Sequence, residues 1–164
     1  MANIVIVWDK RVEMSGGPTS APNESNVNRV TCDATTPMAT LVQKIRNAAA
    51  GDQVSVLRIF AHGGSSRGGK VALAKEGLNK DNVFQFGNGI RGIFADEGRI
   101  ELHSCLVAKD AGTVASDSWI MLSSLAIVSG AYVYAGEEVQ VIAGGKNWDP
   151  DWEGTVWIFP PSGP

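Results

Sequence analysis

The stretch VSVLRIFAHGG, residues 54–64, decides the fold class. Residues 54–60 are nearly all apolar, and an uninterrupted apolar run of this length is typical of a strand covered on both faces, as in a parallel sheet. The run stops before His62 and Gly63, which begin a loop rich in glycine and serine. The sequence therefore predicts a buried parallel strand that delivers a histidine at its carboxyl end.

Strand and helix signals alternate along the rest of the chain. Apolar runs bounded by turn residues predict strands, and apolar residues at helical spacing predict helices. This order favours an α/β fold, namely a three-layer α/β/α sandwich with a mainly parallel central sheet, and no linker divides residues 1–164 into more than one domain. The expected strands are residues 4–8, 27–32, 54–60, 71–73, 99–104 and 131–135, the expected helices are residues 37–50, 78–94 and 114–128, and residues 139–143 and 155–159 are expected to form a closing antiparallel pair.

Composition argues against several classes of function. The 164 residues carry 14 basic and 17 acidic side chains, a net charge of −3, which argues against binding to nucleic acid or to an anionic membrane surface. No apolar run reaches the roughly 20 residues that cross a bilayer, and the N-terminus lacks the basic start of a secretory signal. The two cysteines, Cys32 and Cys105, are too few for a disulfide framework, so we expect a cytoplasmic protein. We expect no cofactor.

Two of the expected strands end in chemically useful side chains. One delivers His62 and the other leads to Cys105, and ligands of an open α/β sheet bind at the carboxyl ends of its strands. If the two strands are neighbours, the imidazole lies beside the thiol and favours the nucleophilic thiolate. Gly63 lets a substrate carbonyl approach the backbone, and its N–H, together with that of Cys105, could hold an oxyanion.

The layout of these segments resembles the caspase-like cysteine peptidases of clan CD, a group that includes caspases, legumains, gingipains and clostripain. The resemblance rests on LRIFAHG (residues 57–63), GRIELHSCLVA (residues 98–108) and LAIVSGAYV (residues 125–133). It covers roughly residues 54–140, and it is strongest to an uncharacterised bacterial branch of the clan.

The resemblance implies a cysteine endopeptidase that acts on peptide or protein substrates. It implies that Cys105 is the nucleophile, that His62 is the base or proton shuttle, and that the amides of Gly63 and Cys105 form the oxyanion hole. Caspases carry Gln-Ala-Cys around the nucleophile, whereas this chain has His103-Ser104-Cys105, so it is not expected to be a caspase itself.

Three further side chains are candidates for contact with a substrate. His103 lies two residues before Cys105, on the same face of the strand, and is a wall of a specificity pocket, the true partner of Cys105, or a hydrogen-bonded sheet histidine. Glu137 and Glu138 follow the expected strand 131–135. They either make the pocket acidic, selecting Lys or Arg before the scissile bond, or form a solvated turn.

Two other classes of function stay open. A catalytically inactive caspase-like module that binds a partner protein would keep the same fold. A small metal-binding or redox domain is the third possibility, although the spacing of His62, His103, Cys32 and Cys105 matches no zinc pattern and no metal site is expected. The sequence does not indicate an oligomeric state.

Overall fold

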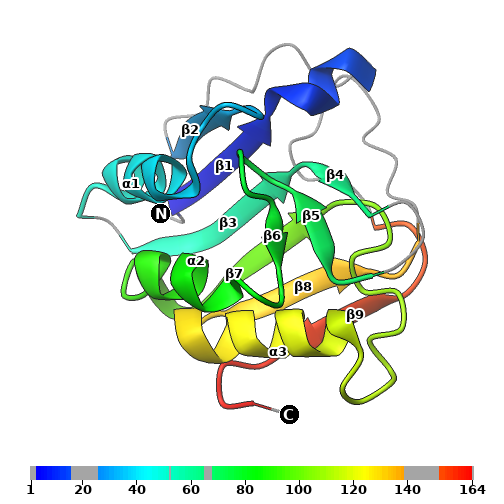
Figure 1. The fold of residues 1–164 in the computed structure, drawn as a ribbon. Coiled ribbons are helices and arrows are strands. Elements are labelled where there is room, and N and C mark those ends of the chain that lie inside the picture. Colours follow the sequence, from blue (N-terminus) through cyan, green and yellow to red (C-terminus); the bar gives the residue numbers. More distant parts are fainter. Residues whose placement is uncertain (1–2, 16–25, 52, 65–67, 139–151, 164) are drawn as a thin grey trace.

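A mainly parallel sheet forms the centre of the computed structural model, which describes residues 3–15, 26–51, 53–64, 68–138 and 152–163 (Figure 1). Among these residues, six strands form the sheet in the order β2-β1-β3-β7-β8-β9. The first five are parallel to their neighbours, and β9 runs antiparallel to β8. The strands are β1 (Asn3–Asp9), β2 (Val27–Cys32), β3 (Val54–Phe60), β7 (Phe94–His103), β8 (Tyr132–Gly136) and β9 (Val156–Phe159).

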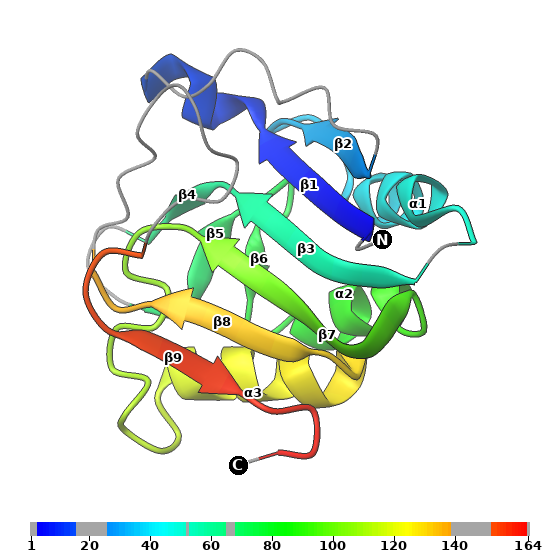
Figure 2. The same ribbon diagram turned by 180° about the vertical axis from the view of Figure 1, so that it is seen from behind.

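In the described part of the chain, three α-helices cover one face of this sheet. They lie in front of the strands in Figure 1 and behind them in Figure 2. The helices are α1 (Met38–Ala49), α2 (Val83–Ile90) and α3 (Asp117–Ser129). The structure thus confirms a mixed α/β fold with a mainly parallel sheet. The α-helices of the described residues cover one face only, so the three-layer arrangement stays a prediction.

A second, small sheet carries the histidine loop. It joins β4 (His62–Gly63), β5 (Lys70–Ala72) and β6 (Leu78–Asn79) in antiparallel order, on the helical side of the main sheet (Figure 1). A short 3-10 helix, η1 (Lys10–Ser15), follows β1. The chain after β3 therefore leaves the main sheet at His62, and its next strands form the small antiparallel sheet on the helical side.

Helix α2 is shorter than the sequence predicts at both ends, because the expected first residues belong to β6 and a turn, and the expected last residues belong to a second turn and to the start of β7. The Asn82 side chain stabilises this turn, since it accepts a hydrogen bond from the Asn79 N–H (2.9 Å) and donates one to the Gly77 carbonyl (2.8 Å). Two glycines within α2 have a packing reason. A Cβ on Gly87 would lie 3.2 Å from Val128 of α3, and a Cβ on Gly89 would lie 2.7 Å from Val42 of α1.

Apolar side chains are buried on both faces of the sheet. The larger cluster lies between the sheet and the helices, and it includes fully buried Leu57, Ile100 and Leu122. A smaller cluster on the opposite face contains Ile6, Trp8, Val12 and Phe60. Burial on both faces explains why β1 and β3 are nearly continuous apolar runs in the sequence.

The end of the chain only partly follows the expected hairpin. Segment 139–143 lies outside the described residues. Strand β9 forms near the expected residues 155–159 and pairs antiparallel with β8, for example Ala135 with Trp157. None of the helices in the described part of the chain is long and apolar enough to cross a membrane.

Candidate functional site

The carboxyl ends of β3 and β7 lie side by side. These strands are parallel neighbours, and their last register pair is Phe60 with His103. Two residues further along each strand direction come His62 and Cys105. The expectation that neighbouring strands bring these two residues to the same edge of the sheet therefore rests on an observed register.

The Gly63 backbone lies directly against the Cys105 backbone. A Cβ built on Gly63 would overlap the Cys105 carbonyl oxygen and would lie 2.6 Å from the carbonyl carbon and 2.8 Å from the amide nitrogen. Real Cβ atoms do not approach backbone atoms so closely. The sequence suggested that glycine makes room for a substrate carbonyl, but in the structure the space beside Gly63 is taken by Cys105 itself.

His62 is exposed, and its ring contacts the backbone of the residue two places after β1. The Nε2 atom lies 3.1 Å from the Arg11 carbonyl oxygen. Because a carbonyl oxygen can only accept, this hydrogen bond requires a proton on Nε2. In the neutral ring the lone pair is then on Nδ1, which is the nitrogen that can take up a proton.

Arg11 is held by a buried carboxylate that the sequence reasoning missed. Asp9, the last residue of β1, is fully buried and accepts hydrogen bonds from Arg11 Nε (2.8 Å) and Nη2 (2.6 Å). Burial alone raises the pKa of Asp9, but the hydrogen bonds from Arg11 and from the Ala74 N–H outweigh it and lower the pKa below its ordinary value. The signal was present in the sequence as an acidic residue that closes an apolar strand.

The two cysteines lie in different environments and form no disulfide. Cys105 is half-buried, whereas Cys32 is buried with its Sγ 3.6 Å from Asp9 Oδ2. Burial and the neighbouring Asp9 carboxylate raise the pKa of the Cys32 thiol to about 12. The structure therefore leaves Cys105 as the accessible thiol of the described residues.

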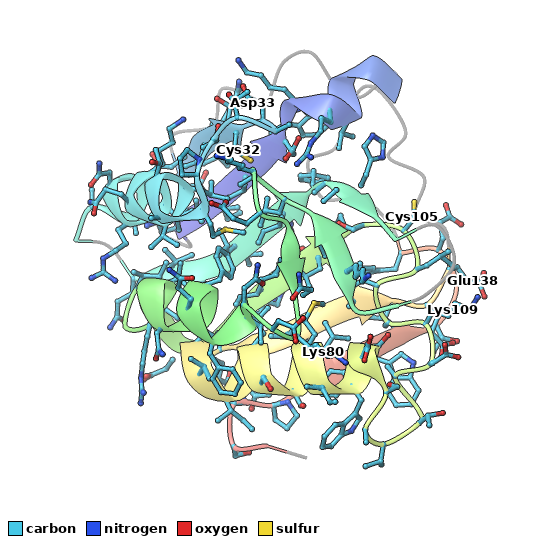
Figure 3. All side chains as sticks on the ribbon, viewed as in Figure 1. Cys32, Asp33, Lys80, Cys105, Lys109 and Glu138 are labelled. Carbon is cyan, nitrogen blue, oxygen red and sulfur yellow. The ribbon has the colours of Figure 1, made fainter. Side chains whose placement is uncertain are left out.

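The segment after Cys105 pairs with the segment after β8. Leu106 N–H donates to the Glu138 carbonyl (3.0 Å) and Ala108 N–H donates to the Gly136 carbonyl (3.0 Å). Figure 3 shows Cys105 and Glu138 on the same side of the molecule, far from Cys32. The main chain thus brings the acidic pair of the sequence to the edge of the sheet that carries Cys105.

The two acidic residues differ in their contacts. The Glu137 carboxylate accepts a hydrogen bond from Trp157 Nε1 (2.9 Å), so β9 holds this side chain. Glu138 is exposed, and the aliphatic part of its side chain lies under Gly154, where a Cβ would come within 3.1 Å of the Glu138 Cβ. Glu138 is therefore the more exposed of the two acidic side chains.

His103 is a buried, hydrogen-bonded sheet histidine. Its side chain is 2% exposed and its Nε2 lies 3.1 Å from Glu101 Oε2. The ring stacks between Phe60, with centroids 5.1 Å apart, and Trp152, with centroids 4.2 Å apart. Of the three roles considered for His103, the hydrogen-bonded sheet histidine is the one that matches these contacts.

The Glu101 carboxylate contacts the side chains of Arg58, Arg99 and His103 on the sheet face away from the helices. Arg58 Nε lies 2.7 Å from one carboxylate oxygen, and Arg99 Nε lies 2.6 Å from the other. Burial alone raises the pKa of Glu101, but the hydrogen bond from His103 and the charge and hydrogen bonds of Arg58 and Arg99 outweigh burial and hold the pKa at about 2. This charged cluster was not anticipated. Arg99, Glu101 and His103 alternate along β7 and share one face, but Arg58 joins them only through the pairing of β3 with β7.

The loops that follow His62 and Cys105 are packed against each other a second time. A Cβ on Gly68 would overlap Ser118 Oγ and the Lys109 carbonyl, and a Cβ on Gly69 would lie 2.7 Å from Ser118 N. Ser118 Oγ also donates a hydrogen bond to the Lys109 carbonyl. The glycine-rich stretch of the sequence is therefore packed onto the first turn of α3.

Among the described residues, His, Cys, Asp and Glu side chains form no group of three or more that could hold a metal ion. Comparison of the chain with protein-family models, with curated proteins and with solved structures finds no match.

Proposed function

We propose that this protein is a cysteine endopeptidase of the caspase-like type, with Cys105 as nucleophile and His62 as general base. The observation that carries the proposal is the contact of Gly63 with the Cys105 backbone, which holds the histidine loop against the nucleophile loop. The three-layer, caspase-like form of the α/β fold and a cytoplasmic location, where thiols stay reduced, belong to the same proposal.

The hydrogen bond of His62 supports the assignment of its role. With Nε2–H directed to the Arg11 carbonyl, Nδ1 is the nitrogen that accepts the thiol proton. Cys105 Sγ then attacks the substrate carbonyl carbon, and the main-chain N–H groups of Gly63 and Cys105 stabilise the oxyanion. His62 returns the proton to the leaving amine, and water, deprotonated by His62, hydrolyses the acyl-enzyme.

We leave His103 out of this catalytic set. Its Nε2 faces Glu101 and its ring is stacked between two aromatic side chains, so moving it to Cys105 would break the buried charged cluster. Its expected part in a substrate pocket stays a prediction.

Glu138 supports a preference for basic side chains before the scissile bond. It is exposed, and its carbonyl is hydrogen-bonded to the residue that follows Cys105. A carboxylate at this position attracts a Lys or Arg side chain of the substrate and repels Asp or Glu. Glu137 supports this preference less, because Trp157 holds its carboxylate.

A peptidyl acyloxymethyl ketone with arginine at the first position tests the proposal directly. We expect it to alkylate Cys105 in the wild-type protein and in Cys32→Ala, and to leave Cys105→Ala unmodified, as read by mass spectrometry of tryptic peptides. His62→Gln should slow the alkylation at least 10-fold, in line with the usual contribution of a general base.

Two results would count against the proposal. Equal modification of Cys105→Ala would remove this thiol from the mechanism. A Cys105 alkylation rate that is ordinary and indifferent to His62→Gln would favour the alternative, a catalytically inactive caspase-like module that binds a partner protein. Replacement of the arginine by aspartate in the probe, together with Glu138→Gln, tests the substrate class, and the exposed Glu97→Gln is the matched control.

A further inference from the structure

The strongest unassigned feature of the molecule is a clamp built by Asp9 and Arg11. The buried Asp9 carboxylate binds the Arg11 side chain through both oxygens, and Asp9 Oδ1 also accepts the Arg11 backbone N–H (3.1 Å). Such a two-point guanidinium–carboxylate contact fixes direction as well as distance. The first turn after β1 is therefore fixed relative to the strand.

The same guanidinium reaches across to the small sheet. Arg11 Nη2 donates to the Ala72 carbonyl (2.7 Å) and to the Ala74 carbonyl (2.8 Å), and the Ala74 N–H donates to Asp9 Oδ2 (3.1 Å). Residues more than 60 positions apart in the chain are thus joined by one side chain. The clamp connects the end of β1 to β5.

His62 lies at the point where both connections meet. In the small sheet His62 pairs with Ala72, whose carbonyl receives the Arg11 guanidinium. The His62 ring contacts the carbonyl oxygen of the same Arg11. Arg11 therefore holds the strand partner of His62 with its side chain and the His62 ring with its backbone.

We propose that the Asp9–Arg11 clamp positions His62, setting both the orientation of its ring and the nitrogen that carries the proton. Arg11 and Asp9 are positioning residues in this inference and take no part in bond breaking. The catalytic consequence rests on the proposed function, whereas the effect on the ring does not.

Lysine cannot replace arginine in this role. The Arg11 side chain makes four hydrogen bonds, one from Nε and three from Nη2, to both Asp9 carboxylate oxygens and to two backbone carbonyls. Reaching these four acceptors at once requires the planar fork of a guanidinium group. A single ammonium group at the end of a flexible chain keeps the charge but not this geometry. Arg11→Lys is therefore the sharpest variant, since it separates charge from position.

Nitrogen-15 NMR of the imidazole rings tests the inference without any assay of peptide cleavage. The chain contains two histidines, so His62→Gln assigns both sets of signals. At pH 8.5, where histidines of ordinary pKa are neutral, we expect wild-type His62 to show a single tautomer with the proton on Nε2. In Arg11→Lys, Arg11→Met and Asp9→Asn, the two ring nitrogen shifts should move toward each other as the ring averages its tautomers.

Two controls are built into the experiment. His103 bonds to Glu101 in a separate cluster, so its ring signals should stay at their wild-type positions and report that the fold is intact. Lys10→Gln alters an exposed residue next to the clamp and should leave both histidines unchanged. The inference would be overturned if the ring nitrogen chemical shifts of His62 kept their wild-type values in Arg11→Lys and Arg11→Met while those of His103 also stayed unchanged.

If the protein cleaves peptides, a second measurement follows. Arg11→Lys should lower kcat about 10- to 100-fold and leave KM nearly unchanged, as misplacement of a base does. If the protein cleaves no peptide, the NMR result still decides whether the clamp positions His62, so failure of the two proposals can be distinguished.

Discussion

Gly63 and Cys105 are in backbone contact, with no space for a side chain between them. This contact joins the loop that carries the candidate base to the loop that carries the candidate nucleophile. The neighbouring atoms on the Cys105 side are carbonyl and amide atoms of the main chain, which cannot rotate away as a side chain would.

Gly63→Ala should therefore destabilise the protein by about 3 kcal/mol, the upper end of the usual cost of overpacking. Urea unfolding followed by circular dichroism measures the change. Gly92→Ala is the control, because nothing lies within 4 Å of its Cβ position and only its positive φ opposes the substitution. The control should cost about 1 kcal/mol, and equal losses in the two variants would contradict the contact.

The two thiols should differ sharply in reactivity. With its pKa raised to about 12, Cys32 carries roughly one thiolate in 10⁴ molecules at pH 8, and it is buried as well. Iodoacetamide under native conditions should modify Cys105 and spare Cys32, whereas both should react in denaturant. Native labelling of Cys32 at the rate of Cys105, read by mass spectrometry, would contradict the buried environment described for Cys32.

The charged cluster around Glu101 should make stability depend on pH in acid. The pKa of Glu101 is lowered from 4.5 to about 2 in the folded protein. The stabilisation of the folded state by the Glu101 carboxylate is therefore complete above about pH 4.5 and is lost as the pH falls toward 2. A shift of this size corresponds to on the order of 3 kcal/mol. Unfolding free energies measured between pH 7 and pH 2 should show this loss.

Glu101→Gln provides the comparison for the pH effect. The amide cannot titrate and removes the charge that Glu101 places 2.7 Å from the buried Arg58 Nε, so the variant should be less stable at pH 7 and should lose less on acidification. The exposed Glu97→Gln should keep the wild-type slope. Parallel pH curves for wild type and Glu101→Gln would exclude Glu101 as the cause.

His103 and His62 should have separable effects. His103→Gln removes a ring stacked between Phe60 and Trp152 and should cost about 2 kcal/mol of stability. It should leave the rate of Cys105 alkylation unchanged, whereas His62→Gln, at an exposed position, should change that rate and leave stability near that of the wild type. The reverse pattern would make His103 the partner of Cys105.

Helix packing at Gly89 should show coupling with Val42. A Cβ on Gly89 would lie 2.7 Å from Val42 Cγ1, and a β-branched side chain has little freedom to move away. Gly89→Ala should therefore cost about 1 to 2 kcal/mol alone. In the Val42→Ala background, Gly89→Ala should instead stabilise the protein by about 1 kcal/mol, because alanine has a better helix propensity than glycine. A double-mutant cycle that is additive within about 0.5 kcal/mol would rule out the contact.

Much of the fold followed from local patterns. The apolar run 54–60 ends next to His62, and the observed β3 has the same bounds, because burial on both faces favours apolar side chains at most of its positions. Expected segment 27–32 is β2. Helix α3 ends one residue after expected helix 114–128 but begins three residues later, at Asp117, because Ser116 caps it. The prediction of helix 78–94 was wrong at both ends: the hydrogen bonds of the Asn82 side chain favour a turn before α2, and the chain after Ile90 turns into β7.

The candidate site was predictable only as a pair of strand ends. Alternation of strands and helices placed His62 and Cys105 at carboxyl ends, because each ends an apolar run that must be buried. Which strands become neighbours is a property of the sheet, and the register of Phe60 with His103 appears only there. The Gly63 contact depends in turn on that register.

The sequence by itself thus determined the buried strands, their order along the chain and the chemical groups at their ends, since hydrophobic periodicity and turn residues act over a few positions. Only the tertiary structure decided that Arg11 meets His62, that Glu138 lies beside the Cys105 segment and that Arg58 meets Glu101. Those contacts join residues distant in the chain, and they depend on hydrogen-bond directions that no local pattern encodes.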